Sequence, residues 1–180
     1  MVDTNTAEPL GDGGDSFMLQ IGELSVRGEL AALVSGLLGV EHSTSAAVHM
    51  YGITALHVAC TTGHYLQQAR AVKATAEAGG VQAVMNAMNM NRSSAVPLHI
   101  ICVRMLTLYA PHSKETQPMW GQWTLEQATK AMECVIKAMR EFTSSLDLQY
   151  CAVSCLVAMC AQAENSWMIM CKMFINNRKS

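Results

Sequence analysis

Apolar residues recur at helical spacing in three similar stretches of the chain. These stretches are residues 48–60, 98–110 and 148–160, and they align without gaps at a step of 50 residues. In the first stretch the apolar or small positions are 48, 52, 53 and 56, which fall on one stripe of a helix. The alignment predicts three equivalent helices with four buried columns. The columns are Val48, Leu98 and Leu148; Gly52, Cys102 and Ala152; Ile53, Val103 and Val153; and Leu56, Leu106 and Leu156.

A second predicted helix precedes each of these stretches and also repeats. "LVSGL" (33–37), "VMNAM" (84–88) and "VIKAM" (135–139) follow one another at steps of 51 residues. Each polar link between the paired helices carries a Ser or Thr suited to cap the following helix; the links are 40–45, 89–94 and 141–146. The predicted unit is therefore a helix, a short polar turn and a longer helix.

The residues at the start of the second unit resemble part of a known type of helical repeat. In "AVKATAEAGGVQAV" (71–84) a helix is expected to end at Ala78, Gly79-Gly80 to stop it, and a new helix to start at Val81. "AEAGGVQAVMNAM" resembles the junction between the first two helices of an armadillo repeat. "SSAVPLHIICVRMLTLYA" resembles the long third helix of that repeat, and residues 133–160 resemble the second and third helices of another copy.

The resemblance covers roughly residues 28–165 and implies an all-α, armadillo-like α-solenoid. It implies about three repeats, at 28–70, 71–123 and 124–165, followed by a terminal helix at 166–176. The period near 50 residues exceeds the ~40–47 of armadillo and HEAT units, and the third copy has no Gly-Gly. Insertions at 61–70 and 111–123 account for the excess, and the second of them, with two Pro and a Gly, is expected to be a loop.

One stretch of the chain also resembles a different type of helical repeat. "YGITALHVACTTGH" (51–64) is similar to the first helix and turn of an ankyrin repeat. Ankyrin units recur at ~33 residues, but this stretch has no second copy at that step and does recur at 50. The armadillo-like interpretation is therefore favoured, and an ankyrin-type interaction module stays as the alternative.

Composition narrows the classes of partner and compartment. The chain has 180 residues with 12 Lys+Arg against 14 Asp+Glu and no concentrated basic block, so nucleic acid is disfavoured as a partner.

Residues 1–16 are acidic and Gly-containing, which predicts a disordered tail before a repeat domain at 17–180. No apolar run is long enough to cross a membrane. With seven Cys and no secretory signal, we expect reduced thiols in an intracellular, cytoplasmic protein.

Two groups of side chains offer metal or thiol chemistry. His57, Cys60 and His64 are spaced to lie on neighbouring helical turns, and Cys151, Cys155 and Cys160 cluster in the third copy. No fourth ligand and no C-x-x-C pair accompanies them, so buried core thiols are favoured over a metal-dependent or thiol-dependent regulatory domain. The sequence contains no catalytic or nucleotide-binding motif, so we expect no enzyme activity and no cofactor.

The resemblance implies a non-enzymatic scaffold that binds a partner protein or peptide along its concave face. The candidate groove residues are polar positions of the repeated third helices: His49, His57, His99, Arg104, Gln149 and Ser154. The Trp and Asn ladder of nuclear-import adaptors is absent from these helices.

At the C-terminal end, Trp167, Met170, Met173 and Phe174 form a stripe expected to dock on the helix of 148–160. A homodimer through this end and the start of a fourth repeat stay open as alternatives.

Overall fold

The fold is all-helical throughout the residues that the computed structural model describes, which are 29–39, 46–92, 96–110 and 123–160. Seven helices and no strands occur in these ranges. They are α2 (Leu30–Gly39), α3 (Ala46–Thr61), α4 (Tyr65–Glu77), α5 (Gly80–Met90), α6 (Val96–Tyr109), α7 (Leu125–Glu141) and α8 (Leu146–Cys160). The expected N-terminal tail, nearly all of the second insertion and the expected C-terminal helix lie outside the described residues.

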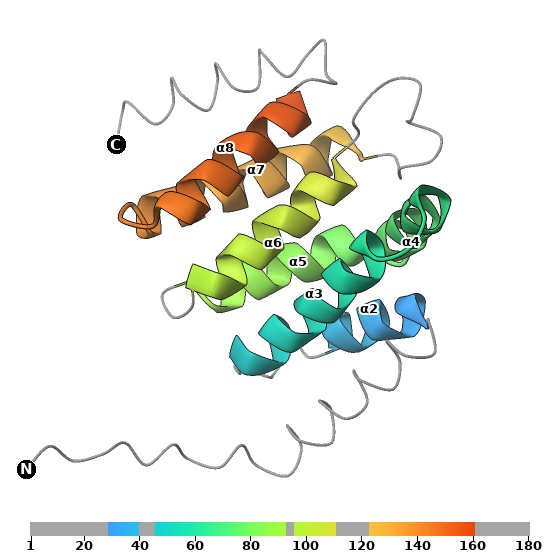
Figure 1. Cartoon of the computed structure of the whole chain (residues 1–180). Coiled ribbons are helices and arrows are strands. Elements are labelled where there is room, and N and C mark those ends of the chain that lie inside the picture. Colours follow the sequence, from blue (N-terminus) through green and yellow to red (C-terminus); the bar gives the residue numbers. More distant parts are fainter. Residues whose placement is uncertain (1–28, 40–45, 93–95, 111–122, 161–180) are drawn as a thin grey trace, which may run out of the picture.

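The helices form two layers (Figure 1). α3, α6 and α8 lie side by side in one layer and run in the same direction, while α2, α5 and α7 form the layer behind them. Each helix of the front layer packs on the helix that precedes it in its pair: α3 on α2, α6 on α5 and α8 on α7. α4 lies at one edge, where it contacts the first two pairs. The predicted pairing of two helices is thus present in all three copies. The predicted order of a shorter helix before a longer one is wrong for the third copy, in which α7 has 17 residues and α8 has 15.

The Gly79-Gly80 junction has the predicted form. α4 ends at Glu77 with Ala78 as its C-terminal cap, and Gly79 has a φ of 95°, a left-handed conformation that glycine adopts without steric cost. α5 begins directly afterwards at Gly80, one residue before the predicted start. α4 begins at Tyr65, so this helix includes the second half of the predicted insertion at 61–70.

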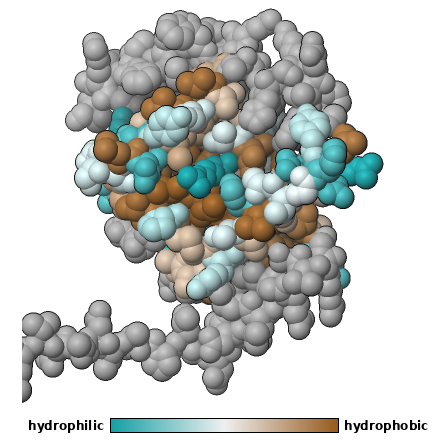
Figure 2. Space-filling view, in the orientation of Figure 1, coloured by the Kyte–Doolittle hydropathy of each residue, from teal (hydrophilic) through white to brown (hydrophobic). Residues whose placement is uncertain are grey.

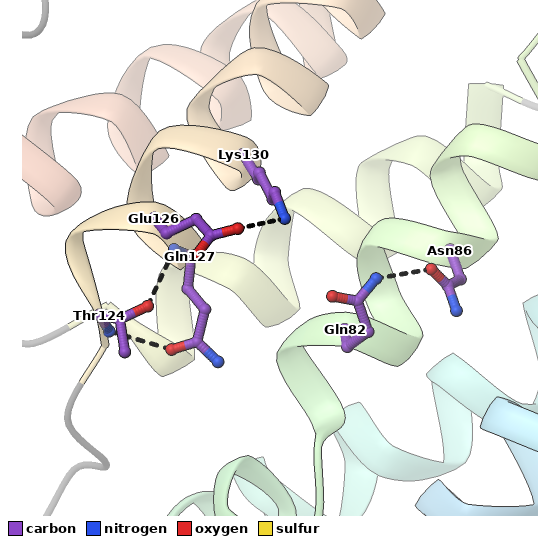
Figure 3. A network of polar contacts seen from close by, with 6 residues as sticks. All are labelled: Gln82, Asn86, Thr124, Glu126, Gln127 and Lys130. Carbon is purple, nitrogen blue, oxygen red and sulfur yellow. Dashed lines mark hydrogen bonds and ion pairs between the residues drawn. The ribbon is translucent and has the colours of Figure 1, made fainter.

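Side-chain caps fix two of the helix starts. Thr124 accepts a hydrogen bond from the backbone N–H of Gln127 at 3.1 Å, and the Gln127 side chain accepts one from the N–H of Thr124 at 2.9 Å (Figure 3). This capping box supplies partners for two N–H groups that the first turn of α7 leaves free. Ser145 likewise accepts a bond from the N–H of Leu148 at 3.4 Å, as predicted for the third link. The corresponding serines of the first two links lie outside the described residues.

The core lies between the two layers and confirms most of the predicted buried columns. Leu56 and Leu106 are both 0% exposed, and the two columns that begin at Val48 and Gly52 are buried in all three copies. The third copy departs in the other two columns, since Val153 is 52% exposed and Leu156 is only partly buried. α8 instead buries Leu148, Ala152, Cys155 and Met159. The prediction of an equivalent buried site for Leu156 is therefore wrong.

Candidate functional site

A groove crosses the outer face of the front layer. It has a volume of about 390 Å³, and its lining comes from α3, α6 and α8. Eight residues line it: His57, Arg104, Thr107, Leu108, Asp147, Tyr150, Cys151 and Ser154. On the face of the molecule that carries these helices, hydrophobic and hydrophilic side chains alternate (Figure 2). The groove therefore offers both apolar contact area and charged groups to a ligand.

Of the six residues that were predicted to line the groove, three do so. His57 comes from α3, Arg104 from α6 and Ser154 from α8. The side-by-side packing of these helices brings together residues that are about 50 positions apart in sequence. The exposed hydroxyl of Ser154 donates a hydrogen bond to the carbonyl oxygen of Tyr150 at 3.1 Å, which leaves its oxygen as an acceptor.

His57 and Arg104 give this part of the groove its basic character. Burial, and secondarily the Arg104 charge, lower the pKa of His57 below its ordinary value of 6.5. At neutral pH the imidazole is therefore uncharged, and Arg104 carries the positive charge. Arg104 is exposed and has no carboxylate within ion-pair distance in the described part of the chain. Among the described residues, nothing therefore competes with a ligand carboxylate for an ion pair with Arg104.

His49 and His99 do not line the groove, which corrects their prediction as groove residues. Both are 2% exposed. Nδ2 of Asn91 donates to the carbonyl oxygen of Ala87 at 2.8 Å and lies 3.2 Å from Nδ1 of His49. Because an amide nitrogen only donates, Nδ1 of His49 accepts this bond. The His99 ring packs on the Phe142 ring at a centroid distance of 4.8 Å.

These two histidine contacts involve equivalent positions of the aligned stretches. His49 and His99 are 50 residues apart on α3 and α6, and their partners Asn91 and Phe142 are 51 residues apart. Asn91 is the C-terminal cap of α5, and Phe142 is that of α7. In each case, a residue of one helix pair contacts the end of the first helix in the next pair. Both side chains thus join successive pairs and lie outside the groove.

Gln149 is also occupied by a structural role. Its side-chain nitrogen donates to the carbonyl oxygens of Met139 at 2.8 Å and Phe142 at 3.2 Å. These bonds satisfy carbonyl groups that the end of α7 leaves without partners in its own helix. Gln149 therefore fixes the turn between α7 and α8 and does not line the groove.

Five groove residues were missed by the sequence analysis: Thr107, Leu108, Asp147, Tyr150 and Cys151. Residues three or four positions apart share a helix face, so Thr107 and Leu108 follow from Arg104. Tyr150 and Cys151 follow in the same way from Ser154. Thr107, Leu108, Tyr150 and Cys151 do not stand out as polar in the aligned stretches. Asp147 lies directly before the third stretch, so an analysis restricted to the polar residues of these stretches passes over it as well.

The groups considered for metal or thiol chemistry are not assembled. Within the described ranges, no group of three His, Cys, Asp or Glu side chains could hold a metal ion. Cys60 is buried, and its sulfur lies 3.7 Å from the Thr75 hydroxyl. Burial raises the pKa of Cys155 to about 12, which keeps the thiol protonated at neutral pH and opposes nucleophilic or ligating chemistry.

The fold and the groove define an all-helical protein of paired, stacked helices with an open surface site. No family model, no curated protein and no solved structure matches the chain. None of the helices within the described residues is long and apolar enough to cross a membrane.

Proposed function

We propose that this protein is a non-enzymatic interaction module with an armadillo-like solenoid architecture. The proposed activity is the binding of a partner protein or peptide in the groove across α3, α6 and α8. The architecture is supported by the three stacked helix pairs and by the equivalent His49 and His99 contacts between pairs. Stacked helical repeats typically present extended binding surfaces of this kind.

The observation that carries the proposed function is the composition of the groove. Leu108, Tyr150 and Cys151 provide apolar contact area beside the charged groups of Arg104 and Asp147. Tyr150 is 77% exposed, and such a large, mostly apolar ring gains free energy when a partner covers it. Tyr and Arg are also the residue types that most often dominate the energetics of protein interfaces. An apolar surface that includes an arginine suits a polypeptide ligand.

Affinity purification with groove variants tests this proposal. The full chain is compared with Arg104→Glu and Tyr150→Ala, and bound proteins are quantified by mass spectrometry. Arg92→Glu is the control of matched charge, because Arg92 is exposed at the end of α5 and lines a separate depression between α5 and α7.

We expect a genuine partner to be lost from both groove variants and retained by the control. The melting temperature should stay nearly unchanged, as is usual for surface substitutions. A partner that binds both groove variants as well as the unaltered chain would place the interface elsewhere. Protection of the α6 and α8 amides from hydrogen exchange in the purified complex provides an independent measure of groove occupancy.

A further inference from the structure

The main part of the groove runs lengthwise between α6 and α8. Its lining residues on α8 follow the spacing i, i+3, i+4 and i+7, which places them on one side of that helix; they are Asp147, Tyr150, Cys151 and Ser154. The facing side of α6 contributes residues at the spacing i, i+3 and i+4, namely Arg104, Thr107 and Leu108. Because α6 and α8 lie side by side and run in the same direction (Figure 1), a ligand that fills this part of the groove lies along them.

Opposite charges lie at two levels of the groove. Asp147 is in the first turn of α8, whereas Arg104 aligns with Ser154, seven residues after Asp147. Seven helical residues extend about 10 Å. Neither charged side chain forms an ion pair with another residue of the described ranges. The groove therefore suits a ligand that carries a basic group and a carboxylate about 10 Å apart.

A ridge of exposed apolar side chains borders the groove along α8. This α8 ridge consists of Leu146, Tyr150, Val153 and Val157, which are 82%, 77%, 52% and 64% exposed. Its members recur at steps of four, three and four residues, which is the spacing at which one helix packs lengthwise on another. A ligand that crossed α8 would cover only part of the ridge, but a ligand aligned with α8 can cover all of it.

The side chains of the groove offer few hydrogen bonds to the backbone of an extended peptide. The hydroxyls of Thr107 and Ser154 donate to the carbonyl oxygens of Val103 and Tyr150, within their own helices, at 2.9 and 3.1 Å. None of the eight lining residues is Asn or Gln, whose amides both donate and accept. The N–H and C=O groups that an extended peptide turned toward the groove would lose water without gaining partners. A helical ligand bonds these groups internally.

We propose that the groove binds an amphipathic helix of a partner protein, aligned with α6 and α8. This inference rests on the proposed function and specifies its ligand. Apolar side chains of the partner helix cover Tyr150 and the rest of the α8 ridge, and an acidic side chain pairs with Arg104. A basic side chain seven positions away lies on the same face of that helix and pairs with Asp147. α8 itself contains no basic residue, so a second α8 docked in the groove would not supply this group.

Selection from two peptide libraries tests the proposal. The first library displays Ala-rich helices that are randomised at four positions of one face, i, i+3, i+4 and i+7. The second displays randomised peptides with prolines in their interior, which prevent helix formation. Both are selected against the full chain, and the binders are measured against Arg104→Glu and Tyr150→Ala, with Arg92→Glu as the control outside the groove. Circular dichroism verifies that all three variants fold.

We expect binders from the helical library with opposite charges at positions i and i+7 and apolar residues between them. Arg104→Glu and Tyr150→Ala should each weaken these binders by about tenfold or more, and Arg92→Glu should not. A new selection against Arg104→Glu should replace the acidic residue of the peptide by Lys or Arg, because the charge that it faces is reversed.

A proline placed on the outward side of a selected helix, in its middle, tests the bound conformation directly. It should weaken binding by about a hundredfold, because it breaks the helix without changing the side chains that face the groove. Gln at the same position is the control and should change the affinity by less than about threefold. Equal affinities of the Pro and Gln peptides would refute a helical ligand.

The remaining outcomes separate this inference from the proposed function. Binders that come only from the proline library and depend on Tyr150 would overturn the helical ligand and leave the groove as a peptide site. An absence of groove-dependent binders from both libraries would count against both proposals. A dimer in light scattering that Tyr150→Ala converts to a monomer would identify a second copy of the chain as the occupant, and would also overturn the proposed partner helix.

Discussion

The substitution Gly80→Ala tests why the chain needs two consecutive glycines at the start of α5. Gly79 requires its left-handed backbone, with a φ of 95°, whereas Gly80 lacks a positive φ and is buried. A Cβ atom at Gly80 would lie 2.7 Å from the backbone oxygen of Thr75 and 3.0 Å from Cζ of Tyr109, and closer still to the Tyr109 hydroxyl. Gly80 is therefore required for space and Gly79 for conformation.

The expected magnitude is a balance of two opposing effects. An extra methyl group forced into a packed core costs about 1–3 kcal/mol, and the backbone oxygen of Thr75 cannot move aside as a flexible side chain could. Alanine in place of glycine in a helix recovers about 0.5–1 kcal/mol. We therefore expect Gly80→Ala to lower the free energy of unfolding by roughly 1–2 kcal/mol.

Urea denaturation followed by circular dichroism measures this loss, and Gly39→Ala is the matched control. An added Cβ at Gly39 would meet nothing within 4 Å, so the control should change stability by less than about 0.5 kcal/mol. Tyr109→Phe removes the closest clashing atom, the buried hydroxyl oxygen of Tyr109. The cost of Gly80→Ala should therefore fall in the Tyr109→Phe background. An equal cost in both backgrounds, or a cost as small as that of Gly39→Ala, would refute the steric explanation.

Three further measurements examine the core, a cap and the groove. Leu106→Ala should lower the free energy of unfolding in urea by about 2–5 kcal/mol; a loss below about 1 kcal/mol would contradict its place in the core. Thr124→Ala should cost about 0.5–2 kcal/mol through loss of the α7 cap, and a similar loss for Thr124→Ser, which keeps the hydroxyl, would contradict that role. In an NMR titration, His57 should titrate below 6.5, and Arg104→Gln should raise its pKa because a neighbouring positive charge is removed; an unchanged pKa would disprove the coupling. Because folding lowers this pKa, the contribution of His57 favours the native state above pH 6.5 and is lost as the pH falls.

Helix ends and helix caps could be predicted because each is determined by a few residues that are adjacent in the sequence. A glycine at the end of a helix, such as Gly79, adopts a left-handed backbone without steric cost. A serine directly before a helix, such as Ser145, caps it. Both effects depend on residues adjacent in the sequence and not on tertiary packing. The repeated step of 50 residues likewise reflects columns such as Leu56 and Leu106, which are buried between the two layers. The sequence analysis predicted where α4 ends, at the Gly79-Gly80 junction, but it gave no start for this helix, which begins at Tyr65.

The groove could be predicted only in part, because polarity alone does not say which flank of a helix faces a ligand. His49 and His57 are both polar residues of α3, but they lie on different sides of that helix. His49 faces the next helix pair and is buried against Asn91, whereas His57 faces the groove. Distinguishing them requires the position of α6 relative to α3, and the sequence of α3 does not contain that information.

The same dependence on the following helix explains why the third copy differs. Val103 and Val153 are the same residue type at equivalent positions, but Val103 is 0% exposed on α6, which has α8 packed against it, while Val153 on α8 is 52% exposed. The burial of these equivalent valines thus depends on the elements that surround each helix and not on the residue type alone. An aligned column can therefore predict a helix and its apolar face in every copy, but it predicts burial only where a further element of the chain, or another molecule, is present to cover that face.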